Sequence, residues 1–492
     1  RVCCPSVSNR DPLAKLSKLV LAFVIINYQA DLLKIKELGV AAFIFYDTET
    51  SGLDKNFGQV FQFAAILTDN KLNVIDTFEI RSRRMPQIVP EPSALLVTGI
   101  NPKTLDQAEY SYYEFATKIR DKILEWSPAI VCGYNTFNFD EHFMRSMFYQ
   151  NLYPPYLTQI NGNSRLDILP LVRAAEHLYP GKINYPINAK GKTSKKLEDV
   201  APANGFTGHD AHDAMGDVMA TVFVARLVKE IAPTLWDRAK ASSSRSAFNS
   251  LIKDDEPIII FDNNNGWPVI FPALKVGKVE NGRNTLFFDL RFDPKILSLN
   301  DVKACFSGRL RPFRRYKDSE VPITLSIEDY NGLGLGLDVD FDRAIASSQT
   351  LHSHFAFEDA VDLYNANRKE FEKSHHVEEQ LYENFHAFDD EKWLLEDFHS
   401  VDANMKAEIA GRFSDERFRK FAQRIVYENF RDRIPPERLL EYDARIKERI
   451  GSDINVPWTT VPKARAVCYE LLKNEPEKAK EIRNILGYLD LL

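Results

Sequence analysis

The stretch AFIFYDTETSG, residues 42–52, decides how the rest of this chain is interpreted. An apolar run from Ala42 to Tyr46 ends in polar residues, which predicts a buried strand that runs out into a loop. Asp47 and Glu49 are two positions apart, so in an extended chain their side chains leave the same face and can share one cation. Because a single D-x-E is common by chance and exposed acidic pairs are usually only solvated, the pair needs partners elsewhere to indicate a site.

The segments that follow predict an α/β domain. Two further strand-like runs are separated by turn residues, and helical patterns then alternate with one more buried strand. Strands followed by alternating helices and strands indicate a mixed sheet flanked by helices. The expected strands are Val60–Leu67, Asn73–Ile80 and Ala129–Gly133, and the expected helices are Tyr110–Trp126, Phe139–Gln150, Leu166–His177 and Asp213–Lys229.

Length and composition indicate a globular protein with several domains. The chain has 492 residues, 44% of them apolar and 27% charged, which is too long for one ordinary core and too apolar for a disordered chain. A net charge of -7 excludes a protein that coats polyanions with its whole surface, so any nucleic-acid contact needs a local basic groove. The longest apolar run, Leu19–Ile26, is far shorter than the roughly 20 residues that span a bilayer. Sparse cysteines without zinc-like spacing favour a reducing cytoplasm.

Changes in pattern along the chain predict three domains after an N-terminal extension. Residues 1–40 form an extension of unknown role, and residues 41–232 form the α/β domain. Short β-type runs at Pro257–Phe261, Thr285–Phe292 and Val321–Ile327 predict a β-rich domain over residues 233–373. Residues 374–492 have few glycines and apolar residues at helical spacing, which predicts an all-helical domain.

Two later segments contain acidic residues at helix starts. Asp140 follows the buried strand and the polar turn GYNTFNF, at the start of a helix, where an aspartate is often only a helix N-terminal carboxylate. In the segment HDAMGD, Asp213 is the natural cap, Asp217 lies one turn inside the helix, and His212 lies on the preceding loop. Taken alone, His212 could be an ordinary loop histidine and Asp217 an exposed helix position.

Together the three segments form, in order, the DEDDh signature of Asp47, Glu49, Asp140, His212 and Asp217. Four converging carboxylates repel one another and raise one another's pKa unless cations neutralise them, and oxygen ligands suit Mg²⁺. Two Mg²⁺ ions, with Mn²⁺ able to substitute, can stabilise the attacking and leaving oxygens of phosphodiester hydrolysis. In this scheme Asp47 bridges both ions, Glu49 and Asp217 complete one site, and Asp140 holds the second largely through water. His212 is the expected general base.

The chain resembles the bacterial exonuclease I family of single-strand DNA exonucleases. The resemblance is dense from about Phe43 to Val228 and beyond that thins to the domain order. It implies an RNase H-like exonuclease domain, an SH3-like β domain and a C-terminal helical domain that enclose a groove for single-stranded DNA. It also implies 3′-to-5′ release of 5′-mononucleotides in DNA repair and recombination, by a monomer that binds the acidic C-terminal tail of single-strand DNA-binding protein. The residues that carry the resemblance are Tyr46–Thr50, Gln62–Ile66, Val97–Ile100, Phe148–Tyr153, Asn163–Arg165, Ile183–Pro186, Ala203–Gly205 and Ala211–Met215.

The resemblance also implies contacts with the substrate strand. Lys196 stands where family members have an arginine. The lysine offers a point charge in place of the bidentate fork of an arginine. Thr98 and Ile100 lie where the terminal base is packed, although a simple turn around Gly99 explains them equally well. The other implied contacts are Glu49, Arg145, Tyr156 and Arg173, which suit substrate positioning, phosphate neutralisation and base stacking.

Further basic residues occur in the two later domains. Such clusters are usually solvated faces, but here they could line the strand groove or receive an acidic protein tail. They are Arg309, Arg311, Arg314, Arg315, Arg412, Arg417, Arg419, Lys420 and Arg424.

Two other functions remain open at this point. The same carboxylates could serve an enzyme that degrades RNA or trims a polymerase-bound primer end, because discrimination depends on contacts to the 2′-OH. A catalytically silent nucleic-acid-binding scaffold is the alternative from another class, and the presence of all five signature residues argues against it.

Overall fold

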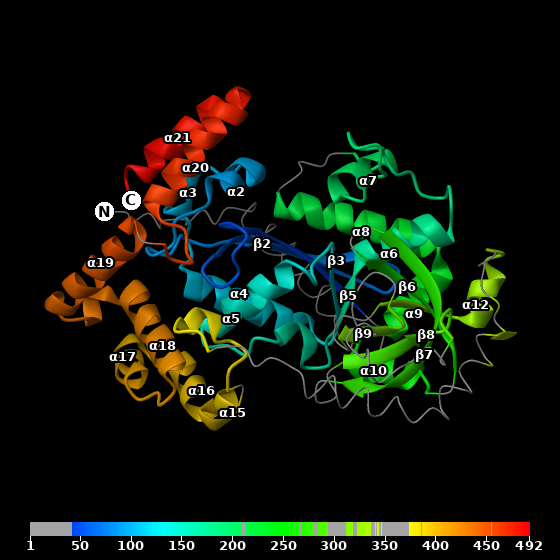
Figure 1. Cartoon of the computed structure of the whole chain (residues 1–492). Coiled ribbons are helices and arrows are strands. Elements are labelled where there is room, and N and C mark those ends of the chain that lie inside the picture. The colour runs from blue at the N-terminus through cyan, green and yellow to red at the C-terminus, as the bar shows by residue number, and fades with distance from the viewer. Residues whose placement is uncertain are drawn as a thin grey trace, which may run out of the picture.

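A computed structural model describes most of the chain beyond residue 41. The described residues are 42–207, 213–254, 256–264, 267–279, 284–293, 311–317, 322–335, 340, 342–343, 346, 373–384, 386–453 and 455–492. They contain two sheets and a set of helices at the C-terminal end (Figure 1). The expected N-terminal extension lies outside the described residues.

The first sheet is mixed and has the strand order β3-β2-β1-β4-β5. Its strands are β1 (Phe43–Thr50), β2 (Val60–Thr68), β3 (Val74–Arg81), β4 (Ile130–Gly133) and β5 (Ser164–Asp167). β1, β2 and β3 form an antiparallel meander, whereas β4 and β5 run parallel to β1. The predicted mixed sheet flanked by helices is therefore confirmed.

The side chains of β1 alternate between two hydrophobic cores, one on each face of the sheet. Ile44 and Tyr46 belong to the core that includes helices α4 (Tyr112–Trp126) and α5 (Asp140–Gln150). Phe43 and Phe45 belong to the opposite core, which includes α6 (Ile168–Leu178), α8 (Ala214–Ile231) and α9 (Pro233–Ala241). This alternation follows from the period of two in an extended chain, and it sets the direction of the polar residues that continue the strand.

Two boundaries in this region differ from the prediction. β1 continues through the expected loop to Thr50, because pairing with β2 extends from Phe43↔Thr68 as far as Thr50↔Val60. Leu166 and Asp167 do not begin a helix; they end strand β5, paired with Cys132 and Gly133 of β4. Asp167 instead caps α6, and it accepts a hydrogen bond of 3.0 Å from the backbone N–H of Leu169.

Shorter elements complete the first region. Gly99 has a φ of 65° and ends α2 as a left-handed cap, so Thr98–Ile100 is a helix end rather than a simple β-turn. Trp236 of α9 lies 5.5 Å from Phe43 between ring centroids, so α9 packs on the first sheet. The elements are α2 (Pro92–Thr98), α3 (Pro102–Leu105), η1 (Leu157–Gln159), α7 (Leu197–Ala203) and α10 (Arg245–Leu251).

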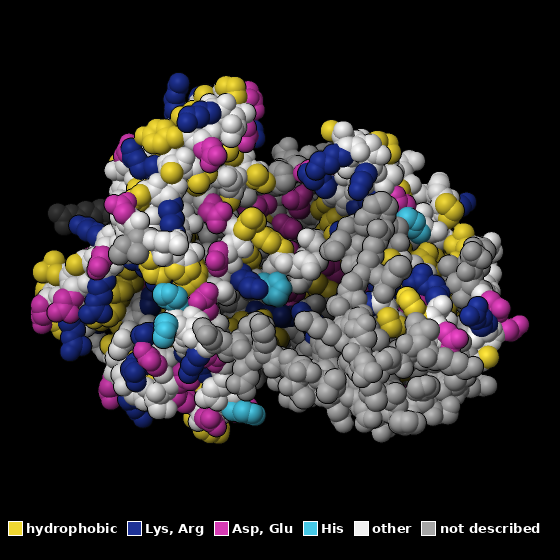
Figure 2. Space-filling model, in the orientation of Figure 1, with side chains coloured by type: hydrophobic (Ala, Val, Ile, Leu, Met, Phe, Trp, Pro, Cys, Tyr) yellow, Lys and Arg dark blue, Asp and Glu magenta, His cyan; other side chains and the backbone are white. Residues whose placement is uncertain are grey.

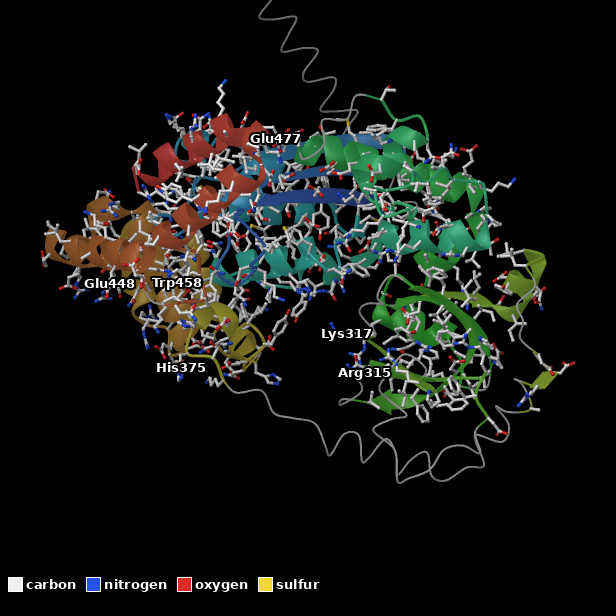
Figure 3. The ribbon with its side chains drawn as sticks, turned by 45° about the horizontal axis from the view of Figure 1, so that its top comes forward. Arg315, Lys317, His375, Glu448, Trp458 and Glu477 are labelled. Carbon is white, nitrogen blue, oxygen red and sulfur yellow. The ribbon has the colours of Figure 1, made fainter. Side chains whose placement is uncertain are left out.

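The second sheet is antiparallel, with the strand order β10-β6-β7-β8-β9, and a short helix, α12 (Ile327–Gly332), follows β10. The β-rich region is as predicted, but two of its strands were not expected. β7 contains Pro272 and Gly277, which weaken a strand pattern. β9 is rich in charged residues: Arg314 is buried beside Asp289, whereas Arg315 and Lys317 lie exposed on the side that faces the helical region (Figure 3). The strands are β6 (Ile258–Asn264), β7 (Trp267–Val279), β8 (Asn284–Asp289), β9 (Phe313–Lys317) and β10 (Ile323–Ser326).

The described part of the C-terminal region is helical, as predicted. Its buried residues, among them Phe398, Phe418 and Ile485, belong to the same core as α4 and α5. None of the described helices is both long enough and apolar enough to cross a lipid bilayer. The elements are η4 (Val377–Glu379), α15 (Ala387–Asp390), α16 (Lys392–Ser400), α17 (Ala403–Ala410), α18 (Glu416–Asn429), η5 (Arg431–Arg433), α19 (Pro436–Gly451), α20 (Val461–Asn474), η6 (Pro476–Lys478) and α21 (Ala479–Leu489).

Charged side chains are unevenly placed on one face of the molecule. Figure 2 shows acidic side chains inside a hollow near the middle of this face, with lysine and arginine side chains beside it over α7. An acidic hollow with a basic rim is what a site that binds cations and an anionic strand requires.

Candidate active site

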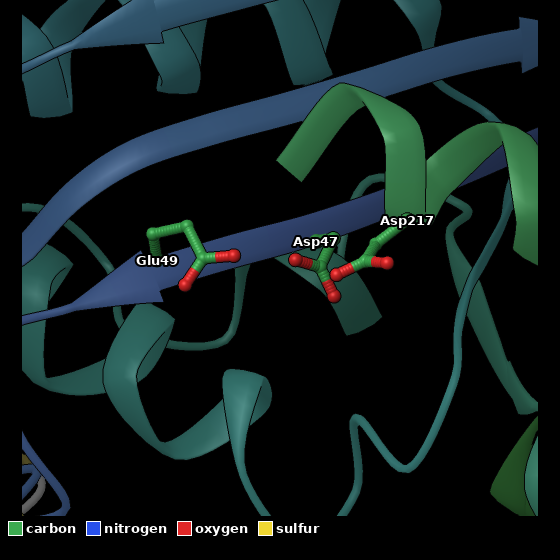
Figure 4. A group of neighbouring side chains, drawn as sticks. All are labelled: Asp47, Glu49 and Asp217. Atoms are coloured by element: carbon green, nitrogen blue, oxygen red, sulfur yellow. The ribbon is translucent and has the colours of Figure 1, made fainter. Parts of the chain in front are cut away.

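Three of the predicted carboxylates converge at the end of β1. Oxygen atoms of Asp47, Glu49 and Asp217 all lie within 4.8 Å of one another (Figure 4). Asp47 and Glu49 come from β1, and Asp217 comes from the first turn of α8. Residues that are 168 positions or more apart in sequence therefore meet in one pocket.

The alternation of β1 explains why these residues meet. Asp47 and Glu49 continue the face of Phe43 and Phe45, which is the face that α8 covers. The start of α8 is fixed by Asp213, whose carboxylate accepts a hydrogen bond of 3.3 Å from the backbone N–H of Gly216. The sequence prediction of Asp213 as the cap is confirmed.

Gln62 connects this cap to the sheet. Its amide donates to Asp213 at 3.0 Å and to Glu79 at 2.9 Å, and Gln62 lies opposite Glu49 in the β1–β2 register. Arg81 reaches the same Asp213 oxygen at 3.5 Å. These contacts hold the beginning of α8 against the strand pair that carries Glu49.

Asp140 approaches the group from the opposite face of the sheet. It is the first residue of α5 and is buried, and its Oδ1 accepts a hydrogen bond of 2.6 Å from the hydroxyl of Thr48. Its charge raises the pKa of both Asp47 and Glu49, so it lies close enough to act on them. The structure thus brings all four predicted carboxylates into one neighbourhood, with three of them in a closer group.

Burial and mutual repulsion disfavour the ionised forms of these carboxylates. Burial first, and then the charges of Asp140, Glu49 and Asp217, raise the pKa of Asp47 well above its ordinary range. Burial, followed by the charges of Asp217 and Asp140, raises the pKa of Glu49 to about 8. Burial also raises the pKa of Asp140 to about 7, although the hydrogen bond from Thr48 opposes the shift. Positive charge in the pocket would relieve this repulsion.

The ligand atoms of the converging group are all carboxylate oxygens. This set suits a hard divalent cation better than it suits the softer metals that favour sulfur and imidazole ligands. The geometry and the raised pKa values therefore fit a divalent metal site formed by Asp47, Glu49 and Asp217, with Asp140 beside it.

His212, the predicted general base, lies outside the described residues. Its neighbour Asp213 is described and lines a cavity together with Arg81, Thr98 and Ile100. The two residues predicted to pack the terminal base therefore line the same cavity as Asp213, which directly follows His212.

Two of the other predicted strand contacts share a cavity with a metal-site carboxylate. Arg173, Lys196 and Asp217 line the same hollow. Lys196 is exposed and forms an ion pair of 2.7 Å with Glu198. A basic wall beside the carboxylate group is the arrangement that a phosphate backbone needs.

Arg145 and Tyr156 lie together, but Arg145 is largely inaccessible. Its guanidinium lies 5.0 Å from the centroid of the Tyr156 ring, and 8% of the residue is exposed. It also pairs with Glu141 at 3.2 Å. Arg145 thus has a structural partner in this conformation, whereas the Tyr156 ring is partly exposed.

Several basic residues of the predicted clusters have structural partners. Arg417 is buried and donates to the backbone oxygens of Gln380 and Asn384 at 2.9 and 3.0 Å. Arg424 donates to the backbone oxygen of Gln150 at 2.6 Å. These arginines join segments of the fold, while Arg309 lies outside the described residues. In contrast, Arg315, Arg412 and Lys420 are exposed.

Three polar residues at the site were not predicted from sequence to have a role. They are Thr48 and Gln62, described above, and Glu141, which follows Asp140 and is buried. Thr48 and Glu141 are adjacent in sequence to predicted ligands, and this adjacency is the only sequence signal for them, because their burial is visible only in the structure.

Comparisons with known proteins find similarity to exonucleases. The family model described as Exonuclease matches residues 44–225, which contain every described carboxylate of the site. The chain is 36% identical to exodeoxyribonuclease I of Buchnera aphidicola subsp. Acyrthosiphon pisum over 54% of this chain and 66% of that protein. It is 38% identical to exodeoxyribonuclease I of Escherichia coli K12 over 40% of this chain and 42% of that protein. For these two relatives, the aligned part is thus less than two thirds of the relative's length.

A longer alignment covers about three quarters of the chain. The chain is 30% identical to exodeoxyribonuclease I of Haemophilus influenzae over 76% of this chain and 84% of that protein. The solved structure of E. coli exonuclease I with a dA16 oligonucleotide has a TM-score of 0.77 and 23% identity, and it covers 92% of this chain and 99% of that one. Exonuclease I of Methylocaldum szegediense has the same fold, with a TM-score of 0.75 and 24% identity over 92% of this chain and 99% of that one.

Fold and site together define a protein of the exonuclease class, with an acidic metal site on a mixed sheet. The chain belongs to the exodeoxyribonuclease I family.

Proposed function

We propose that the protein is a magnesium-dependent exonuclease that degrades single-stranded DNA from the 3′ end and releases 5′-mononucleotides. The convergence of Asp47, Glu49 and Asp217, with their oxygens within 4.8 Å of one another, is the observation that carries the proposal. Membership of the exodeoxyribonuclease I family supports it, as does the basic wall beside these carboxylates.

The chemistry follows from the positions of the carboxylates. Asp47, Glu49, Asp217 and Asp140 would hold two Mg²⁺ ions: Asp47 would serve both ions, Glu49 and Asp217 the first, and Asp140 the second. Bound ions supply charge stabilisation to both the attacking and the leaving oxygen of the phosphodiester, and Mn²⁺ could replace Mg²⁺. His212 would accept the proton of the attacking water, because its ordinary pKa is near 6.5.

The substrate strand is proposed to follow the basic residues beside the site. Arg173 and Lys196 would contact phosphates, Tyr156 would stack on a base, Arg145 would support it, and Thr98 and Ile100 would pack the terminal base. Glu49 would also contact the terminal nucleotide. A solved structure of E. coli exonuclease I contains a dA16 oligonucleotide, and this supports DNA as the substrate class.

Finer features of the family extend the proposal. The exonuclease domain (residues 41–232) would be RNase H-like, the β domain (233–373) SH3-like, and residues 374–492 the helical domain. We propose a cytoplasmic monomer that acts in DNA repair and binds the acidic tail of single-strand DNA-binding protein. A solved structure of that protein with exonuclease I and an inhibitor supports this partner.

A time course of nucleotide release tests the proposal. Matched DNA and RNA oligonucleotides, single-stranded and duplex, are incubated with the full chain in Mg²⁺ or in chelator. We expect mononucleotides from the 3′ end of single-stranded DNA in Mg²⁺ only, and Asp47→Ala should abolish release while strand binding remains. Faster release from RNA would instead indicate an exoribonuclease, preference for a mismatched primer end a proofreading enzyme, and strand binding without release a scaffold.

A further inference from the structure

Glu141 is a buried carboxylate that follows Asp140 in the first turn of α5. Its side chain is 2% exposed, and it accepts hydrogen bonds or ion pairs from four side chains. Burying a charge is unfavourable unless several donors compensate it, and here two arginines and two hydroxyls do so. Such complete compensation indicates that the position of Glu141 is fixed.

The two oxygens of Glu141 contact different parts of the fold. Oε2 accepts from Arg165 of β5 at 2.8 Å, from Arg145 of α5 at 3.2 Å and from Thr158 of η1 at 3.1 Å. Oε1 accepts from the hydroxyl of Tyr46 at 3.1 Å. Among the described residues, Tyr46 is therefore the residue whose side chain ties this carboxylate to β1.

Tyr46 and Thr48 occupy the face of β1 opposite to Asp47 and Glu49. Thr48 bonds to Asp140, and Tyr46 bonds to the next residue of α5. Alternate residues of one short strand thus provide metal-site carboxylates on one face and contacts to the start of α5 on the other. Asp140 and Asp47 come from different elements, and these contacts join the two elements next to both residues.

We infer that Glu141, through its bond from Tyr46, is a positioning residue that keeps Asp140 in place relative to Asp47. This inference rests on the proposed function, since it assigns Glu141 a role in the metal site of that reaction. Arg165 and Arg145 hold Oε2 of Glu141, and Tyr46 connects Oε1 to the strand that carries Asp47 and Glu49.

The inference is tested by comparing two variants that each remove one hydroxyl from the same carboxylate. Tyr46→Phe removes the bond to β1, whereas the matched control Thr158→Val removes the bond to η1, which carries no proposed ligand. Calorimetric titration of Mg²⁺ into the full chain without DNA measures metal affinity, and thermal unfolding in chelator measures stability. Nucleotide release against Mg²⁺ concentration gives the half-maximal concentration.

We expect Tyr46→Phe to weaken Mg²⁺ binding and to raise the half-maximal Mg²⁺ concentration by about tenfold, as is typical when a partner that orients a metal ligand is lost. Thr158→Val should lower thermal stability to a similar extent and leave both metal readouts unchanged. Glu141→Gln, which keeps the volume but removes the charge, should weaken Mg²⁺ binding at least as much as Tyr46→Phe.

Two results would overturn the inference: equal Mg²⁺ affinities of Tyr46→Phe and wild type, or equal losses in Tyr46→Phe and Thr158→Val. The failure of the proposed function is a distinct result. In that case the wild-type protein releases no nucleotide in Mg²⁺, whereas calorimetry still shows whether Tyr46 affects the metal site.

Discussion

The hydroxyl of Thr48 donates a hydrogen bond of 2.6 Å to Oδ1 of Asp140, across the interface between β1 and α5. This bond favours the ionised form of Asp140, in opposition to the burial that raises its pKa to about 7. Strand β1, which carries Asp47 and Glu49, therefore also lowers the pKa of a carboxylate at the start of α5.

Replacing Thr48 with valine should make metal binding more sensitive to pH. Without the donor, the pKa of Asp140 rises further, so deprotonation and metal binding require a higher pH. We expect the half-maximal Mg²⁺ concentration at pH 7 to rise by roughly tenfold and the difference from wild type to shrink at pH 9. The control is Thr50→Val, because Thr50 is buried on the same strand and donates to the backbone oxygen of Gly52 instead. Identical Mg²⁺ profiles for the two variants would contradict this prediction.

The stability of the metal-free protein should fall as the pH rises from about 5 to 8.5. The raised pKa of Glu49, about 8, means that the folded state retains a proton that the unfolded state releases near pH 4.5. The stability is thus fully present below the unfolded pKa and is lost as the pH rises through the folded pKa. We expect a decrease in Tm of at least about 2–4 °C in chelator, a smaller decrease in Mg²⁺, and a flatter profile in Glu49→Gln. A Tm in chelator that rises over this range would argue against the arrangement.

Lys196 should contribute one phosphate contact to strand binding. Lys196→Ala is expected to weaken the binding of single-stranded DNA and to reduce the salt slope of log K by about 0.7, measured with Asp47→Ala protein to prevent digestion. The control is Lys478→Ala, since Lys478 has a similar ion pair with Glu475, 2.8 Å long, in the C-terminal helices. Equal slopes for both variants would remove Lys196 from the proposed strand path.

His399 should destabilise the protein in acid. Burial, with the nearby charges of Lys406 and Arg120, lowers its pKa to about 4, while its ring stacks on Tyr153 at 3.9 Å between centroids. Its stabilising effect is present above the unfolded pKa near 6.5 and is lost as the pH falls through 4. Relative to His399→Phe, we expect wild type to lose about 2 kcal/mol of unfolding free energy between pH 7 and pH 5, measured by denaturant unfolding.

The variant that checks this effect is His399→Phe, which keeps an aromatic ring and removes the titration. His399→Phe should be less stable than wild type at pH 7, and the difference in unfolding free energy between the two proteins should shrink as the pH falls to 5. His386→Phe, at an exposed histidine of the same helical region, should retain the full dependence. The same pH dependence in His399→Phe as in wild type would disprove the assignment.

The converging carboxylates could be predicted from the sequence because their spacing and their neighbouring residues are visible in a single chain. Asp47 and Glu49 share a strand face by periodicity alone, and Asp217 follows a recognisable cap. The partners of these residues could not be predicted in this way, because Thr48 meets Asp140 and Tyr46 meets Glu141 only through packing between distant segments.

Elements without clear local patterns were also missed. Strand β9 has two adjacent arginines, which do not form a recognisable strand pattern. One of them, Arg314, is buried because it pairs with Asp289, and this pairing depends on the tertiary structure. Similarly, Arg145 looked like a surface contact in the sequence, and its burial under Tyr156 and beside Glu141 depends on the tertiary structure.

The C-terminal helices share one continuous hydrophobic core with α4 and α5, so they form part of the packing of the first domain. The hydroxyl of Tyr149 on α5 donates to the backbone oxygen of Val377 at 2.7 Å, and apolar side chains from both regions fill the space around it. A nuclease shortened to its first domain would expose this apolar face to water and lose the support behind Asp140. The smallest version of this protein that keeps Asp140 supported is therefore expected to include the C-terminal helices that pack on α4 and α5.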